Sequence, residues 1–537
     1  LPRFTDHSNN LQLSSTRSGK KLIPASVSPA NMRYRSTRGG EVNLSFQDVL
    51  FAGYSEDGGL YMPESVPTVS AAELKAWATL SYRQLLYQIS RKFIDTQEIP
   101  DNDLRDIIES AFRKFKSDEE MKLVNVTQST VEADDIWILE LFKGPTFAFK
   151  DLALSFVAGL LEYFLLKDQR HVTILVGTSG DTGGAAINAI EGRANMTLIV
   201  LLPRHRCTVP QMLQMVTSQH SNIVVYSVDG LSDDLDVPIK KCFASADFMK
   251  RHNLMSINSI NWGRILGQVA HFFYSFFRRT QTKQTSELLS VEIVLPTGAA
   301  GNITSGCLAE AMGLPVTLVA AVNTNDIMAR AINGDFSIVP QVHHSLSSAM
   351  DIQMPYNFER MLYLFSEFNV QLVASLMKTF EEQGRVKIPD SILSNMKKVI
   401  TDTCVHDDDR VLQVMRMVHH SHGYLLCPHT AVAVVYHYKC PPIATKPRLY
   451  IATASPTKFP EALKKALTST DPKLESVSQH LPDKEASAIV HNVCQPLDHL
   501  KSLPTKSLMM DQGENWEKML REKIEEINAT WLNEICV

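Results

Sequence analysis

From residue 136 onward, short runs of apolar residues alternate with segments that have the hydrophobic spacing of helices. Because these runs are apolar at successive positions, both faces of each strand are expected to be covered. The strands are expected at residues 136–141, 172–176, 197–202, 223–228, 291–295, 316–322 and 449–452. The intervening helices are expected at 152–166, 185–190 and 308–312. This alternation predicts an α/β fold with mostly parallel sheets, in which ligands lie beyond the carboxyl ends of the strands.

The two ends of the chain differ from this central part. Residues 32–130 are mostly helical in pattern, with a Gly-rich turn at 56–59, and are expected to form a separate N-terminal domain. Residues 471–537 form a C-terminal extension, in which 516–535 repeat apolar residues every three or four positions and predict one amphipathic helix. This helix is expected to pack on the body of the protein, with a partner chain as the alternative. Residues 1–31 are interpreted as a disordered or non-native extension.

Composition excludes several kinds of partner. The net charge of −5 is spread over 537 residues without a Lys/Arg-rich block, which argues against nucleic-acid binding. The longest apolar run, 152–166, contains Glu162 and is too short to span a bilayer, so no membrane partner is expected. A homodimer remains an alternative to a monomer, because the sequence pattern does not decide the oligomeric state.

The cysteines indicate a reducing compartment. The eight cysteines are scattered and include no Cys-x-x-Cys pair, so a cytoplasmic location is expected. Residues 1–31 hold six serines and four Lys/Arg against one acid, a composition that is compatible with a transit peptide. A mitochondrial location is the alternative if this segment is such a peptide, and secretion is a further alternative.

Lys150 lies between the expected strand 136–141 and the apolar helix that follows it, in the segment Phe147-Ala-Phe-Lys-Asp151. A free lysine has a pKa near 10.4, so only about one in 2,500 is a neutral nucleophile at pH 7. Apolar neighbours such as Phe147 and Phe149 disfavour the ammonium form and favour an amine that can attack an aldehyde. Lys150 is therefore a candidate catalytic residue, and the alternative is a surface lysine that opens a helix.

Two glycine-rich loops follow expected strands and lead into helices. In the first, residues 177–184, hydroxyl groups and the free backbone amides of a helix start form a site for a carboxylate or a phosphate. Its candidate residues are Ser179, Gly180, Asp181 and Thr182. The alternative for this loop is a tight turn between strand and helix.

The second loop, residues 296–306, repeats this arrangement with Gly298, Gly301 and Gly306. Successive amide donors at a helix terminus bind a phosphate without a nearby Lys or Arg. Two such loops imply two anionic groups, the phosphate of a cofactor and the carboxylate of a substrate. Together with a lysine in an apolar setting, they are what a pyridoxal-phosphate enzyme requires.

No metal site is expected. His419-His-Ser-His422 with Cys427 and His429 resembles a metal cluster, but zinc sites use fixed ligand pairs, so a helix end followed by a packed turn is favoured. Asp407-Asp-Asp409 lacks the Gly and the terminal Glu of a calcium loop and is expected to be a solvated helix start.

A series of motifs runs along residues 32 to about 470. In chain order they are Ser36-Thr-Arg-Gly39, Asp57-Gly-Gly-Leu-Tyr-Met-Pro63, Phe147-Ala-Phe-Lys-Asp151, Thr178-Ser-Gly-Asp-Thr-Gly183, Asn258-Ser-Ile-Asn-Trp-Gly-Arg264, Asn323-Thr-Asn-Asp326, Ser347-Ser-Ala-Met-Asp351, Asn357-Phe-Glu-Arg360, Pro428-His-Thr-Ala431 and the segment from Thr453 to Phe459. In sequence and order they resemble the threonine synthase family, which consists of pyridoxal-phosphate enzymes of fold type II. The resemblance implies two three-layer α/β/α domains with mostly parallel sheets, beside the mainly helical N-terminal domain. The large, cofactor-binding domain would comprise 131–168 and 263–470, and the small one 169–262.

The resemblance also implies roles for individual residues. Lys150 would carry the cofactor aldehyde covalently, and Thr453 would face the pyridine nitrogen. The cofactor phosphate would be held by Gly298, Ala299, Ala300, Gly301 and Asn302. The substrate carboxylate would be held by Ser179, Gly180, Asp181 and Thr182. The substrate phosphate would be held by Asn258, Asn261 and Arg264, with a packed polar turn as the alternative for these three.

The chain departs from the common family pattern near the expected substrate. Ser455 and Cys427 stand where the family commonly has His and Asp, and the phosphate loop reads Gly298-Ala-Ala-Gly-Asn302. These versions resemble the threonine synthase-like 2 branch, whose members act as phospho-lyases. The expected substrate is therefore a phosphorylated amino acid, O-phosphothreonine or O-phosphohomoserine, converted to 2-oxobutanoate, ammonia and phosphate. The alternatives are a threonine synthase acting on O-phosphohomoserine and a non-catalytic or secreted signalling member of the family.

Overall fold

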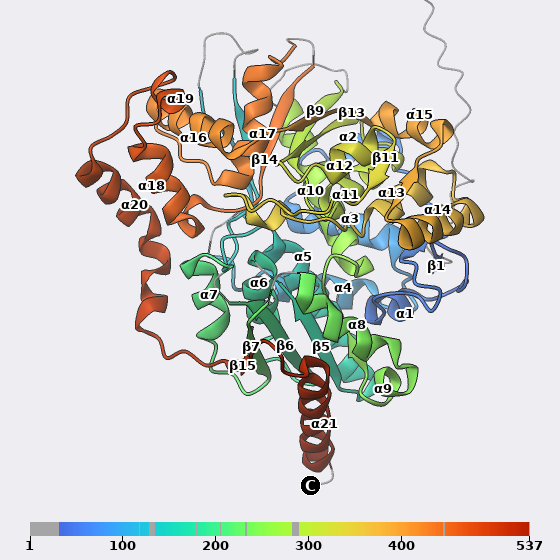
Figure 1. The fold of residues 1–537 in the computed structure, drawn as a ribbon. Helices are drawn as coiled ribbons and strands as arrows, with labels where there is room; N and C mark the ends of the chain where they lie inside the picture. Colours follow the sequence, from blue (N-terminus) through green and yellow to red (C-terminus); the bar gives the residue numbers. More distant parts are fainter. Residues whose placement is uncertain are drawn as a thin grey trace, which may run out of the picture.

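The computed structural model describes residues 32–116, 119–127, 135–178, 180–204, 206–230, 233–281, 289–443 and 446–535 (Figure 1). Within this part of the chain the strands form a six-stranded sheet, a five-stranded sheet and two pairs of strands. Helices cover the two larger sheets, which confirms the predicted α/β class with mostly parallel sheets. In the same residues, no helix has the length and apolarity needed to cross a membrane.

The six-stranded sheet forms the core of the larger α/β part. Its strands, in spatial order, are β13 (Ile400–Val405), β10 (Val316–Val322), β9 (Val291–Pro296), β14 (Arg448–Ala452), β4 (Trp137–Glu140) and β3 (Lys122–Asn125). The first five are parallel to one another, and β3 pairs antiparallel with β4. The helices in contact with the central strands include α10 (Trp262–Gln281), α11 (Gly301–Ala311) and α17 (Pro428–Lys439). The central strand β9 is buried along its whole length, as the run of apolar residues predicts.

Further elements surround this sheet. They are α5 (Lys150–Asp168), α12 (Ile327–Ile332), β11 (Asp335–Ser337), η4 (Ser348–Met350), α13 (Phe358–Phe365), α14 (Val370–Gln383), β12 (Arg385–Lys387), α15 (Asp390–Val399), α16 (Asp408–His422), η5 (Pro456–Lys458) and α18 (Pro460–Thr468). The side chain of Asp407 caps the start of α16, and His419 to His422 form its last turn, as predicted. The described residues hold no group of three or more His, Cys, Asp or Glu side chains arranged to bind a metal ion.

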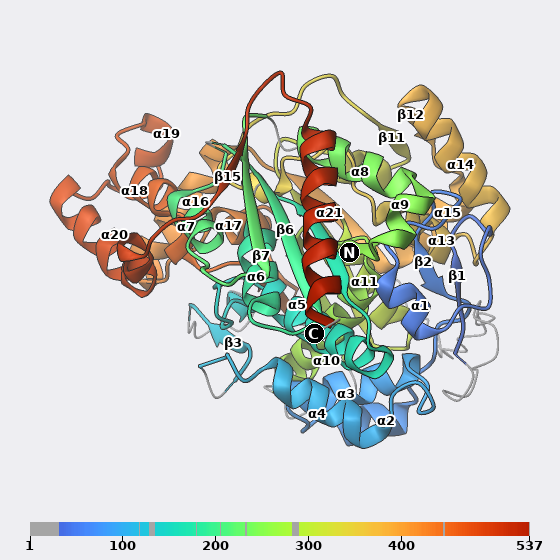
Figure 2. The same cartoon turned by 90° about the horizontal axis from the view of Figure 1, so that it is seen from below.

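The five-stranded sheet is parallel throughout. Its order is β15 (Leu508–Met510), β7 (Ile223–Val228), β6 (Met196–Pro203), β5 (Val172–Gly177) and β8 (Leu254–Met255). One face is covered by α6 (Asp181–Ile190) and α7 (Val209–Val216). The other face is covered by η3 (Asp233–Leu235), α8 (Asp236–Ala244), α9 (Ala246–Arg251) and α21 (Trp516–Ile535) (Figure 2). The result is a three-layer arrangement.

The N-terminal part is mainly helical, as predicted. It contains β1 (Tyr34–Ser36), α1 (Phe46–Phe51), β2 (Tyr61–Pro63), α2 (Ala71–Trp77), α3 (Tyr82–Phe93) and α4 (Asp101–Ala111). Ser45, Ser70 and Ser81 each form a capping box that satisfies free backbone amides at the start of α1, α2 and α3. Because α3 packs on α10 and α4 packs on α5, this part is joined to the larger α/β part.

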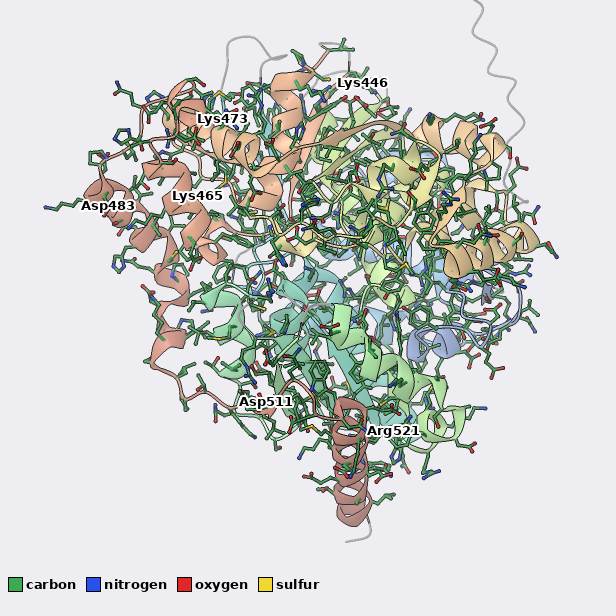
Figure 3. All side chains as sticks on the ribbon, in the orientation of Figure 1. Lys446, Lys465, Lys473, Asp483, Asp511 and Arg521 are labelled. Carbon is green, nitrogen blue, oxygen red and sulfur yellow. The ribbon has the colours of Figure 1, made fainter. Side chains whose placement is uncertain are left out.

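The C-terminal extension packs on the body of the protein. It runs through α19 (Pro472–Glu475), α20 (Asp483–Asp498) and η6 (His499–Ser502) before it reaches β15 and α21. The predicted amphipathic helix is confirmed as α21, which buries Leu520 and Ile524 against the five-stranded sheet. Arg521 of α21 donates a hydrogen bond to the carbonyl of Lys241 in α8 at 2.9 Å (Figure 3).

Two strands lie outside the residue ranges expected for their domains. Strand β3 falls within 32–130 but pairs with β4 of the six-stranded sheet. Strand β15 falls within 471–537 but extends the five-stranded sheet beside β7. The two strands have only three and four residues, so no hydrophobic pattern long enough to indicate a strand appears in either of them. The division into 131–168 with 263–470 and 169–262 stays a prediction.

Candidate active site

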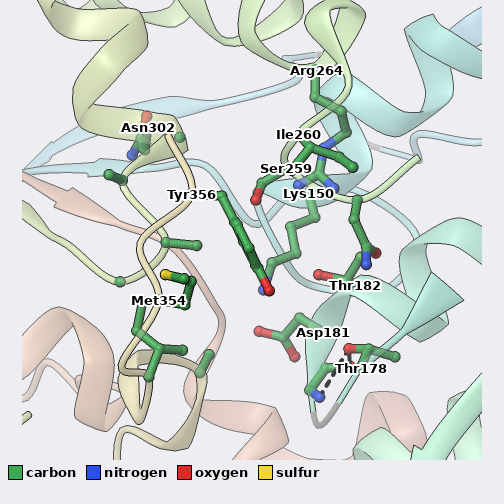
Figure 4. Close-up of a pocket in the computed structure, with 18 of the residues that line it drawn as sticks. Lys150, Thr178, Asp181, Thr182, Ser259, Ile260, Arg264, Asn302, Met354 and Tyr356 are labelled. Carbon is green, nitrogen blue, oxygen red and sulfur yellow. Dashed lines mark hydrogen bonds between the residues drawn. The ribbon is translucent and has the colours of Figure 1, made fainter. Parts of the chain in front are cut away.

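A cavity of about 270 Å³ is lined by residues that follow strands of both larger sheets (Figure 4). Thr178 and Asp181 come after β5, Gly298 comes after β9, and Thr453 comes after β14. Lys150, the first residue of α5, also lines it. Parallel strands bring the loops at their carboxyl ends to one edge of a sheet, which is where the sequence predicted the ligand site.

Lys150 lies on a backbone segment that is fixed to the end of β14. The amide of Phe149 donates to the carbonyl of Thr453 at 2.8 Å, and the amide of Ser455 donates to the carbonyl of Phe147 at 3.0 Å. Burial lowers the pKa of the Lys150 ammonium from 10.5 to about 8. This is the effect that the apolar neighbours predicted. The lysine therefore presents a partly neutral amine to the cavity at neutral pH.

The residues 298–302 all line the cavity and lead into the first turn of α11, whose amides have no acceptor inside the helix. A Cβ on Gly298 would lie 3.0 Å from the carbonyl oxygen of Ala349, so the loop has no room for a side chain there. Among the described residues, the buried Nδ2 of Asn302 has no hydrogen-bond partner. A group with several anionic oxygens, such as the phosphate of a cofactor, fits this set of unoccupied donors.

Asp181 at the start of α6 is held by a buried ion pair. Its Oδ1 lies 2.7 Å from Nζ of Lys458 and accepts a hydrogen bond from Nε2 of Gln211 at 2.9 Å. Burial alone would raise the pKa of Asp181, but the charges of Lys458 and Lys150 outweigh it and hold this pKa below its usual range. An ionised carboxylate has no proton to donate, so the side chain of Asp181 offers nothing to a substrate carboxylate.

Other described residues of the 178–182 loop line the same cavity. Gly180 and Thr182 both line it, and the amide of Gly180 donates to Oγ1 of Thr178 at 3.1 Å (Figure 4). Ser179 lies outside the described residues. Thr182 thus adds a hydroxyl to the cavity beside the start of α6, as the sequence predicted for a helix start in this loop.

Of the three candidate residues in the segment 258–264, two line the cavity and one does not. Asn258 and Arg264 line it, and Arg264 donates through Nη1 to the carbonyl of Ile257 at 3.0 Å. Burial lowers the pKa of Arg264 to about 10, which still leaves it charged at neutral pH. Asn261 instead donates to the carbonyl of Leu50 at 2.8 Å and is fully buried. Asn261 thus supports the turn and is not among the residues that line the cavity.

Sequence reasoning missed the roles of two buried residues. Lys458 pairs with Asp181 and also donates to the carbonyl of Thr146 at 2.9 Å. His429 was considered in a metal pattern and lies in the motif 428–431, but no role was predicted for it. It lines the cavity, and its Nε2 accepts a hydrogen bond from the amide of Ala349 at 3.2 Å. Burial lowers the pKa of His429 to about 4, so it is neutral at pH 7. The sequence did contain a signal for each residue: Lys458 is a charged residue inside the motif 453–459, and His429 is a polar residue inside the motif 428–431.

Comparison with known proteins agrees with this geometry. Residues 33–112 match the family described as threonine synthase N terminus, and residues 122–440 match the family described as pyridoxal-phosphate dependent enzyme. Threonine synthase-like 2 from Xenopus laevis is 44% identical over 499 residues, which cover 93% of this chain and 99% of the relative.

Two solved structures of threonine synthases also resemble this chain over most of its length. Threonine synthase from yeast matches with a TM-score of 0.81 and 32% identity, covering 94% of this chain and 100% of that one. The pyridoxal-phosphate-bound threonine synthase from Brucella melitensis matches with a TM-score of 0.78 and 32% identity, covering 92% of this chain and 99% of that one. The chain therefore belongs to the threonine synthase family of pyridoxal-phosphate-dependent enzymes.

Proposed function

We propose that this protein is a phospho-lyase that eliminates phosphate from a β- or γ-phosphorylated amino acid, such as O-phosphothreonine or O-phosphohomoserine. With one molecule of water, either substrate gives 2-oxobutanoate, ammonia and phosphate. The observation that carries this proposal is a lysine of lowered pKa in a cavity that also presents two separate groups of anion-binding donors.

The cofactor is assigned to Lys150, the loop 298–302 and Thr453, which all line the same cavity. Lys150 would hold its aldehyde carbon, the loop 298–302 would hold its phosphate, and Thr453 would contact its ring nitrogen. When bound, pyridoxal phosphate supplies an electron sink for the charge that develops at the α carbon of the substrate. The unoccupied amides of α11 and the Nδ2 of Asn302 support this assignment, because they would otherwise be buried donors without acceptors.

Lys150 is assigned the proton transfers. The amine of Lys150, when it is not bonded to the cofactor, would remove the proton from the α carbon of the substrate. A pKa of about 8 lies close to neutral pH, so the same nitrogen can take up a proton and return it. The buried ion pair of Asp181 and Lys458 lies near this amine, and its two charges shift the pKa of Lys150 in opposite directions.

The two anionic groups of the substrate are assigned to different elements. Arg264 and Asn258 bind its phosphate, because Arg264 is charged and its Nε has no partner among the described residues. Thr182 and the amides at the start of α6 bind its carboxylate. In this arrangement the α carbon of the bound substrate lies beside Lys150, and the substrate phosphate lies at the guanidinium of Arg264.

Elimination is favoured over threonine synthesis by two departures from the common family pattern. Ser455 caps η5 and Cys427 caps α17, where the family commonly has His and Asp. Cys427 is two residues from His429 and Ser455 is two residues from Thr453, and both His429 and Thr453 line the cavity. Replacing a carboxylate and an imidazole at these positions removes two acid–base groups from the surroundings of the cavity, so fewer such groups are available to direct water onto the β carbon. Both outcomes share every step up to the loss of phosphate and differ only in whether water adds before the product is released.

The test is to incubate the purified protein with each phosphorylated amino acid and to measure phosphate, ammonia, 2-oxobutanoate and threonine. Equal amounts of phosphate, ammonia and 2-oxobutanoate, absent in Lys150→Ala, are the expected result. Threonine without the oxo acid would instead identify a threonine synthase. Phosphate release no faster than in Lys150→Ala would leave a non-catalytic member of the family.

A further inference from the structure

We propose that His271 is a positioning residue that holds the side-chain amide of Asn302 with its NH₂ group toward the anion at the start of α11. His271 lies on α10, outside the residues that line the cavity, and acts only through Asn302. The inference rests on the proposed function in one respect, the assignment of the cofactor phosphate to the loop 298–302.

The contact between the two side chains is buried. Nε2 of His271 lies 2.8 Å from Oδ1 of Asn302. His271 is 0% exposed and Asn302 is 8% exposed, so bulk water does not compete for either group. Asn302 lines the cavity (Figure 4), and its Nδ2 has no hydrogen-bond partner among the described residues. One end of the amide is thus fixed to α10, while the donor end is available to a ligand.

The chemistry of the amide explains why its orientation matters. A side-chain amide has an acceptor oxygen at one end and two donor hydrogens at the other. If the amide of Asn302 rotated by half a turn, it would present its oxygen to an anion, which repels it. A neutral imidazole that carries its proton on Nε2 can donate to Oδ1 and so favours the useful orientation. Burial lowers the pKa of His271 to about 4, which keeps the ring neutral at physiological pH.

The packing of α10 against α11 prevents His271 from moving away. The hydroxyl of Ser305 in α11 donates to the carbonyl of Ile265 in α10 at 3.0 Å. A Cβ on Gly306 would lie 2.8 Å from the ring of Phe272, so the two helices are in close contact at this point. His271 is adjacent to Phe272 in α10 and is held at a fixed distance from the first turn of α11.

The test measures cofactor binding and does not depend on turnover. Cofactor-free protein is titrated with pyridoxal phosphate, and the dissociation constant is obtained from the absorbance of the bound form. His271→Phe keeps an aromatic ring without a donor and is expected to bind the cofactor at least about tenfold more weakly, or about 1.4 kcal/mol. His271→Gln places an NH₂ group near the position of Nε2 and is expected to restore binding to within about threefold.

Two further variants make the outcome decisive. His271→Asn is polar but too short to reach Oδ1 of Asn302, so it is expected to bind as weakly as His271→Phe. Asn302→Ala is expected to weaken binding as well, and His271→Phe is expected to add no further loss in the Asn302→Ala background, because the two residues form one unit. The contrast between Gln and Asn decides the question even if His271→Phe does not fold, which near-UV circular dichroism would show.

The possible failures are distinguishable. If Asn302→Ala binds weakly but every His271 variant binds like the native protein, the positioning role is wrong and the phosphate site stands. If Asn302→Ala and Gly298→Ala both bind the cofactor normally, the phosphate site itself is wrong. The chemical shift of the bound phosphate in ³¹P NMR gives a second readout, since it should change in His271→Phe and not in His271→Gln.

Discussion

Lys150 is expected to titrate near pH 8 in the cofactor-free protein, because burial lowers its pKa from 10.5 to about 8. At pH 7 a pKa of 10.5 leaves about 1 amine in 3,000 neutral, whereas a pKa of 8 leaves about 1 in 11 neutral. The difference is a roughly 300-fold increase in the form that attacks an aldehyde. The fold of the protein thus increases the neutral fraction of this nucleophile before any ligand is bound.

The assay is competitive labelling of the cofactor-free protein with a trace of an amine-reactive reagent from pH 6 to pH 11. Mass spectrometry then gives the extent of modification at each lysine. Lys378, whose side chain is 75% exposed, serves as the reference for reagent reactivity. The expected result is half-maximal reactivity of Lys150 about two to three pH units below the value of 10.5 for an unburied lysine.

Two substitutions should move the pKa of Lys150 in opposite directions. The charge of Asp181 raises it, so Asp181→Asn is expected to lower it below 8. The charge of Lys458 lowers it, so Lys458→Met is expected to raise it above 8. Half-maximal reactivity near 10.5 in the native protein, or a shift of both variants in the same direction, would refute the reasoning. Near-UV circular dichroism of each variant checks that the cavity is still folded.

Three further predictions concern stability and binding. Lys458→Met leaves the buried charge of Asp181 without its cation and is expected to lower the free energy of unfolding by about 3–5 kcal/mol in urea titrations; a change below about 1 kcal/mol would contradict this. Gly298→Ala places a Cβ 3.0 Å from the carbonyl of Ala349, so the dissociation constant for pyridoxal phosphate should rise about tenfold, and unchanged binding would count against the loop as phosphate site. Leu520→Ala, at a side chain with 0% exposure, should cost about 2–5 kcal/mol. Leu532→Ala, at 49% exposure, is its control and should cost less than about 0.5 kcal/mol.

Most of the α/β core could be predicted from the sequence, because its central strands are continuous apolar runs. Strands β5, β6, β9 and β10 all lie at or within a few residues of the expected ranges. Strand β13 was missed because it is an edge strand in which only Ile400 and Cys404 are buried, and the polar residues Thr401, Asp402 and Thr403 interrupt its apolar pattern. Strand β8 has only two residues, which is too short for any pattern to appear.

The candidate site was predictable where one local segment carries the chemistry. Lys150 and the loop 298–302 are recognised from their immediate neighbours, and both line the cavity. The pair of Asp181 and Lys458 joins two segments far apart in the chain, so neither residue alone indicates it. Asn261 looked like a ligand because it is polar within a motif, but its amide satisfies a backbone carbonyl. Whether a polar side chain faces the cavity or satisfies a buried backbone group depends on tertiary contacts, which the sequence pattern does not show.

The face of the five-stranded sheet that α8, α9 and α21 cover has a consequence for folding during translation. Leu175 and Ile199 on this face are covered in part by α21, which leaves the ribosome after every residue that lines the cavity. In a growing chain, part of the apolar surface of this sheet therefore stays exposed while the residues between β8 and β15 are translated. Chaperones are expected to bind that surface during this interval. Early stop codons within α21 should for this reason cause aggregation in cells even though every residue of the cavity has been synthesised.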